Sequence, residues 1–170
     1  MTDDVFRHNV ILLKSNADTI KENFPDVREA MEKNIIIKRS QEYRDLSSAL
    51  DFIYNLSKSC DHQRLYDDIR RKTEEDFMNR TEPAFRRFLV EYFRKNYATK
   101  KKRLSVIEND PRWSWIATLY PGTFIEQKKV IFLSLDKFLY RNASIAGASG
   151  NIWKSDLMKG AYILIDEIDS

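Results

Sequence analysis

The run Tyr162-Ile163-Leu164-Ile165-Asp166-Glu167-Ile168-Asp169 carries the clearest structural signal in this 170-residue chain. Its apolar residues predict a buried strand from Ala161 to Ile165, and two acids follow at the carboxyl tip of that strand. Open α/β sheets bind their ligands at the carboxyl ends of strands. Adjacent acids there suit a hydrolytic site, because one carboxylate can hold Mg²⁺ while the other orients and deprotonates a water molecule.

Two further apolar segments predict additional strands, at Asn9–Lys14 and Val130–Ser134. Strands that are apolar on both faces are typical of a parallel sheet covered by helices. The stretch of about residues 40–118 instead has the spacing of amphipathic helices. We therefore predict an α/β fold in which residues 40–118 form a large helical insertion between strands of a parallel sheet.

Local signals predict where several helices begin and end. The run Ser15–Asp18 offers N-cap residues for a helix to about Phe24, and Pro25 suits the first turn of a second helix, from Asp26 to about Lys33. The β-branched residues Ile35–Ile37 could form a short strand or an apolar linker. Thr81 can cap a helix whose apolar stripe we expect to lie in the core, namely Phe85, Phe88, Leu89, Tyr92 and Phe93.

The order of these segments resembles the first motor domain of superfamily 2 helicases, of the DEAD/DEAH, type III restriction-like kind. The residues that carry the resemblance are Asn9–Asn16, Val130–Leu139 and the acid run Tyr162–Asp169, a Walker B motif. The resemblance implies a partial RecA-like parallel sheet within one partial motor domain, residues 1–170. Its parts would be an early strand with helices (1–39), the helical insertion (40–118) and an α/β segment that ends in the Walker B strand (119–170).

The resemblance also implies the roles of individual residues. Asp166 would bind Mg²⁺, Glu167 would be the general base for ATP hydrolysis, and Asp169 would couple the nucleotide to the neighbouring lobe. Ser134 and Lys137 would contact the nucleic-acid backbone. The implied cofactors are ATP and Mg²⁺, and the implied partners are nucleic acid, DNA more than RNA, and the remaining motor lobes.

A phosphate-binding loop of the form G-x-x-x-x-G-K-[ST] is missing. The nearest stretch is Gly147–Ser155, where three residues separate Gly150 from Lys154 and no strand precedes the lysine. We interpret it as an ordinary loop. Positioning is most of phosphoryl-transfer catalysis, so we expect a fragment that does not hydrolyse ATP by itself.

Two alternatives remain open. One is a fragment of an AAA+ ATPase, although such modules carry a phosphate loop in a region that here contains no glycine. The other is a non-enzymatic helical domain that binds nucleic acid or protein through its tyrosines and basic clusters, such as Lys100–Arg103. The exposure of Trp113 and Trp115 discriminates, because exposed tryptophans would favour a stacking surface and buried ones a core.

Composition excludes several classes of protein. Apolar residues make up 42% and charged residues 32%, which is typical of a folded domain, and the net charge of +3 is too small to indicate nucleic acid by itself. One cysteine, Cys60, and two histidines, His8 and His62, cannot form an intramolecular disulfide or a zinc site of Cys and His ligands. The sequence has no apolar window of membrane-spanning length and no signal peptide, so we expect a cytoplasmic protein.

Overall fold

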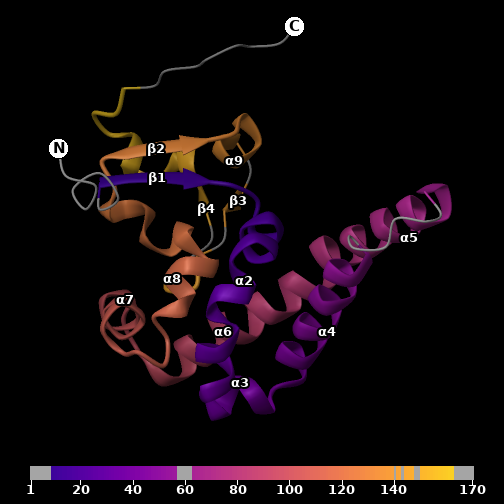
Figure 1. Ribbon diagram of the computed structural model, residues 1–170. Helices are drawn as coiled ribbons and strands as arrows, with labels where there is room; N and C mark the ends of the chain where they lie inside the picture. The colour runs from indigo at the N-terminus through magenta and orange to yellow at the C-terminus, as the bar shows by residue number, and fades with distance from the viewer. Residues whose placement is uncertain (1–8, 57–62, 140, 143, 148–149, 163–170) are drawn as a thin grey trace, which may run out of the picture.

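The computed structural model describes residues 9–56, 63–139, 141–142, 144–147 and 150–162. These residues are mostly helical and contain two small sheets of two strands each (Figure 1). The predicted α/β fold with a RecA-like parallel sheet is therefore wrong for the described chain. The physical reason is that the apolar stripes of the helices build the main core by packing on one another, and only four residues of each main strand pair.

The larger sheet joins two segments that lie far apart in the sequence. Strand β1 (Val10–Leu13) pairs in parallel with β2 (Val130–Leu133), with Val10 opposite Val130 and Leu13 opposite Leu133. Both strands occur where the sequence predicted them, and the helices of the main core lie between them in sequence. The smaller sheet pairs β3 (Arg141–Asn142) with β4 (Gly150–Asn151) in antiparallel orientation.

The parallel sheet is covered on one face. Ile11 and Leu13 are buried against Ile152, whereas Leu12, Val130 and Phe132 on the other face are 45–59% exposed. The prediction that the strands are buried on both faces is thus wrong for the described residues. No described element packs over the second face.

The third predicted strand, Ala161–Ile165, is not formed in its described part. Gly160, with φ of 76°, follows a short 3-10 turn, and Ala161 and Tyr162 after it belong to no strand. Tyr162 is 98% exposed, the opposite of a buried strand residue. Residues 163–165 lie outside the described chain.

The helices form one shared core below the sheet in Figure 1. Buried side chains of α2, α4, α6 and α8 meet there, and α6 supplies Phe85, Leu89 and Phe93, as its stripe predicted. The helical elements are α2 (Asn16–Lys33), α3 (Ile35–Arg39), α4 (Gln41–Leu56), α5 (Gln63–Asp76), the π-helix η1 (Phe77–Thr81), α6 (Glu82–Asn96), α7 (Lys100–Asn109), α8 (Trp115–Leu119), α9 (Leu135–Leu139) and the 3-10 segments η2 (Pro121–Gln127), η3 (Ile152–Lys154) and η4 (Asp156–Met158).

Three local predictions are corrected. Thr81 makes no side-chain cap, because its helical backbone continues η1 directly into α6. Ile35–Ile37 is helical and not extended, since the Asn34 side chain accepts the Ile36 N–H at 3.1 Å and caps α3. The helical period over about residues 63–78 predicts that Ile69 faces inward, but Ile69 of α5 is 37% exposed.

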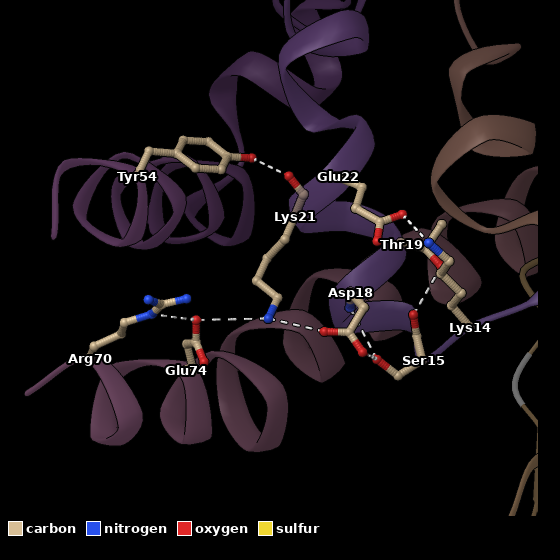
Figure 2. Close-up of polar contacts among 9 residues, drawn as sticks. All are labelled: Lys14, Ser15, Asp18, Thr19, Lys21, Glu22, Tyr54, Arg70 and Glu74. Carbon is tan, nitrogen blue, oxygen red and sulfur yellow. Dashed lines mark hydrogen bonds and ion pairs between the residues drawn. The ribbon is translucent and has the colours of Figure 1, made fainter. Parts of the chain in front are cut away.

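Helix α2 continues through Pro25, where the sequence predicted a new helix. Proline has no N–H, so the carbonyl of Lys21, four residues earlier, loses its helical partner. The Tyr54 hydroxyl of α4 donates to that carbonyl at 2.8 Å instead (Figure 2). Burial raises the pKa of Tyr54 to about 12, so the hydroxyl keeps its proton at neutral pH. Tyr54 of α4 therefore supplies the hydrogen bond to the Lys21 carbonyl that Pro25 cannot donate.

We expect Tyr54→Phe to lower the free energy of unfolding by about 1 kcal/mol, because a partly buried carbonyl loses its donor. In a Pro25→Ala background the same change should cost less, since the introduced alanine has an N–H that can bond to the Lys21 carbonyl. Urea unfolding followed by circular dichroism measures both costs. Tyr162→Phe, at an exposed position, is the control and should have no effect. An equal cost of Tyr54→Phe in both backgrounds would contradict this explanation of the unbroken helix.

Candidate functional site

The predicted site residues fall into two groups. Ser134 and Lys137 are described, whereas Asp166, Glu167 and Asp169 lie outside the described residues. Ser134 is exposed at the start of α9, where its hydroxyl accepts the Lys137 N–H at 3.4 Å. Lys137 is half-buried and its side chain lines a pocket that Ser134 does not line.

This pocket lies beside the carboxyl end of β1 and has a volume of about 110 Å³. Its walls come from the end of β1, the first turn of α2, the start of α7, η2, α9 and the segments around β4. Lys14, Lys100 and Lys137 reach it from three separate parts of the chain. We call it the lysine pocket. A position at the carboxyl end of a parallel strand is where α/β sheets commonly bind ligands.

Each of these lysines has an acidic neighbour. Lys14 Nζ contacts both carboxylate oxygens of Glu22 at 2.8 Å (Figure 2), and Lys100 is paired with Glu126. Burial lowers the pKa of Lys137, and the nearby Glu82 carboxylate opposes that shift. Lys14, Glu22, Lys100 and Glu126 are 41–59% exposed, so their pairs are each worth at most about 1 kcal/mol.

Glu82 is a buried carboxylate, and it is only 3% exposed. Arg86, one turn further along α6, donates to it at 2.8 Å. Tyr120 is fully buried, and its pKa is raised well above the ordinary value, first by burial and then by the charge of Glu82. The π-helix η1 ends immediately before Glu82, and π-turns often mark functional sites. Glu82 therefore belongs to a buried polar cluster close to Lys137.

The first turn of α2 is firmly capped beside the lysine pocket. The Ser15 hydroxyl accepts the Asp18 N–H at 3.0 Å and donates to the Asp18 carboxylate at 2.5 Å. This second hydrogen bond is the main cause that lowers the pKa of Asp18. Lys21 lies 3.0 Å from Asp18 and 3.9 Å from Glu74, and so connects α2 to α5 (Figure 2).

Two buried threonines line the lysine pocket and differ in their hydrogen bonds. The Thr19 hydroxyl donates to the Ser15 carbonyl at 2.9 Å. Thr123 is 5% exposed, and its hydroxyl has no hydrogen-bond partner among the described residues. A buried polar group without a partner is uncommon in folded proteins and calls for a physical explanation.

Several basic residues of the sequence clusters have structural roles. Arg103 donates to the carbonyls of Ala146 at 2.6 Å and Tyr97 at 2.8 Å, and so ties the start of α7 to the segment before β4. Arg70 and Arg71 pair with acids four residues further along α5. Arg70, Arg71 and Arg103 therefore make ion pairs or hydrogen bonds within the fold.

Trp113 and Trp115 are 1% and 3% exposed and pack against aromatic rings of α6. Their burial places both tryptophans in the core and not on a stacking surface. The glycine-rich stretch around Gly150 forms β4, and Lys154 lies 4.6 Å above the Trp153 ring.

The described residues contain no group of three or more His, Cys, Asp or Glu that could hold a metal ion. Asp166, the predicted Mg²⁺ ligand, and also His8, Cys60 and His62 fall in parts of the chain that the structure leaves undescribed. We derive no metal chemistry from the described site.

The sequence analysis named Lys137 for backbone contact and Lys100 within the basic cluster Lys100–Arg103, but it did not single out Lys14 or Thr123. Lys14 had a usable signal, because it directly follows β1 and therefore lies at the carboxyl end of a strand. Thr123 had none, and only the tertiary fold brings η2 and the start of α7 to this pocket.

A comparison with models of known protein families gives no match, and a search of curated proteins finds no similar sequence. Among the described helices, none is both long and apolar enough to cross a lipid bilayer. We therefore infer function from the lysine pocket and from the sequence motifs.

We expect Thr123→Val to raise the free energy of unfolding by up to about 1 kcal/mol, because it removes an unpaired buried hydroxyl. Thr19→Val is the matched control, and it should lower the free energy of unfolding by a similar amount, since its hydroxyl is paired. Urea denaturation of the two variants without added ligand measures both effects. A loss of stability in Thr123→Val equal to that in Thr19→Val would show that the Thr123 hydroxyl has a partner.

Proposed function

We propose that this chain is part of a cytoplasmic ATP-dependent nucleic-acid motor and that the lysine pocket faces the nucleic-acid backbone. The observation that supports this best is the place of the pocket, where Lys14, Lys100 and Lys137 meet beside the carboxyl end of a parallel strand. Lysines attract backbone phosphates, and this attraction supplies most of the sequence-independent affinity for DNA.

In this proposal the residues of the acid run Tyr162–Asp169 carry out ATP binding and hydrolysis. Asp166 would hold Mg²⁺, Glu167 would act on the attacking water and Asp169 would couple the site to a neighbouring lobe, as the helicase resemblance implies. ATP would supply the free energy for movement along DNA. The pocket residues have a separate task, which is to bind and orient the strand, and Ser134 would add a backbone contact near Lys137.

A second candidate is a helical module that binds nucleic acid without hydrolysing ATP, and the predominance of helix favours it. Such a module usually stacks bases on exposed aromatic side chains. Trp113 and Trp115 are buried, so these two tryptophans provide no stacking surface for such a module.

The binding test uses the 170-residue chain and labelled single-stranded DNA of mixed sequence, followed by fluorescence anisotropy over a range of salt concentrations. We expect Lys137→Gln to weaken binding and to reduce the salt dependence, by about one unit in the slope of log K against log salt. Lys38→Gln is the matched control, because α3 lies at the opposite end of the molecule from the sheet (Figure 1).

Two results would argue against the proposal. One is the absence of binding at low salt to single-stranded DNA, duplex DNA and RNA alike. The other is an equal effect of Lys137→Gln and Lys38→Gln, which would place the contact elsewhere. The division of tasks would be wrong if the chain alone hydrolysed ATP with Mg²⁺ and lost this activity in Glu167→Gln.

A further inference from the structure

The lysines of the pocket converge on one small cavity and do not line a groove. Lys14 follows β1, Lys100 begins α7 and Lys137 lies in α9. A groove that follows a nucleic-acid strand spreads its cations along successive phosphates. A cavity of about 110 Å³ has room for a few water molecules or for one phosphate group. The geometry therefore fits a single phosphate better than a continuous strand.

The charges around the cavity favour a doubly charged ligand. Of the side chains that line it, three are lysines and one, Glu126, is a carboxylate. Glu22 and Glu82 lie outside the lining, beside Lys14 and Lys137. A phosphomonoester carries a charge of roughly −1.5 to −2 at neutral pH, whereas a backbone phosphodiester carries a single charge. The monoester balances the lining more fully.

The ion pairs of Lys14 and Lys100 do not prevent these lysines from binding a ligand in place of their carboxylate partners. The partners Glu22 and Glu126 are more than half exposed, so water can solvate each carboxylate when its lysine turns to a ligand. Exposed pairs of this kind are weak. If the buried Thr123 side chain turns toward the cavity, a phosphate oxygen would also give its hydroxyl an acceptor that the described residues do not provide. Four elements would then contact one ligand.

The N-terminus of α2 adds a favourable field. Asn16 and Thr19 of its first turn line the pocket, and the 18-residue helix directs the positive end of its dipole there. Asp18 of the same turn does not line the pocket. Its carboxylate accepts a hydrogen bond from Ser15 and forms an ion pair with Lys21.

We propose that the lysine pocket binds a phosphomonoester dianion, namely the terminal phosphate of a nucleic-acid strand. This inference rests on the proposed function and makes it more specific, because it assigns the pocket to a strand end and not to the backbone in general. The same chemistry is present in a free mononucleotide, and the experiment separates the two sources.

The experiment compares strands of one sequence that end in a 5′-phosphate, a 3′-phosphate or hydroxyls only, by fluorescence anisotropy with the full 170-residue chain. We expect one phosphorylated strand to bind at least about tenfold more tightly than the hydroxyl strand, the gain typical of a charge-assisted hydrogen bond. Thr123→Val and Lys100→Gln should remove this preference, so that each variant binds the phosphorylated and the hydroxyl strands equally. Lys38→Gln should keep the preference. AMP and inorganic phosphate are added as competitors.

Each outcome bears on one of the two proposals. Equal binding of all three strands, still weakened by Lys137→Gln, would overturn the terminal-phosphate pocket and leave the backbone-binding motor intact. A preference that survives in both Thr123→Val and Lys100→Gln would place the phosphate at another site and also overturn the inference. If AMP binds and no strand does, the occupant is a mononucleotide and both proposals about nucleic acid fail.

Discussion

The parallel pairing of β1 with β2 is the contact on which the rest of the structure depends. The two strands bring residues 10–13 against residues 130–133, and the Lys129 N–H extends the ladder to the carbonyl of Asn9 at 2.9 Å. A pair of short strands is barely stable alone. It is stabilised by the apolar cluster of Ile11, Leu13 and Ile152 and by the helical core, whose residues lie between the two strands in sequence. Because the pairing sets where β1 ends, it also places Lys14 near α9 and forms one wall of the lysine pocket.

The helical core depends on polar groups as well as on apolar stripes. Tyr54 completes α2 at the carbonyl that Pro25 leaves open, and Asn34 caps α3 while it donates to the Arg112 carbonyl at 3.0 Å. Both side chains connect segments that are distant in sequence, α4 with α2 and the start of α3 with the turn before α8. The lysine pocket differs in this respect, because Thr123 leaves a buried hydroxyl unpaired there among the described residues. Among the described residues, the buried hydroxyls of Tyr120 and Thr123 both lack a hydrogen-bond partner, and Thr123 lies in the wall of the candidate site.

The sequence predicted what depends on local pattern. The stripe of Phe85, Leu89 and Phe93 and the two strands of the parallel pair follow from periodicity, and the structure confirms them. The predicted helix break at Pro25 was wrong because Tyr54, from another helix, donates to the Lys21 carbonyl that the proline leaves without a partner. The predicted burial of both strand faces was wrong because no described element covers Phe132. At the site, Lys137 came from a resemblance, whereas its neighbours come from segments that only the tertiary fold brings together. The roles of Asp166, Glu167 and Asp169 stay predictions.

The most direct test of this account is a disulfide measurement of the β1–β2 register. In a Cys60→Ser background, Leu12→Cys with Phe132→Cys places two exposed thiols directly opposite each other on the open face of the sheet. Leu12→Cys with Val130→Cys shifts the pair by two residues, to a Cα separation of roughly 8 Å, which is too long for a disulfide. Mild oxidation followed by mass spectrometry should show a rapid cross-link in the first variant and none in the second. Equal cross-linking of both variants, or cross-linking of neither, would contradict the parallel pairing and with it the pocket built on it.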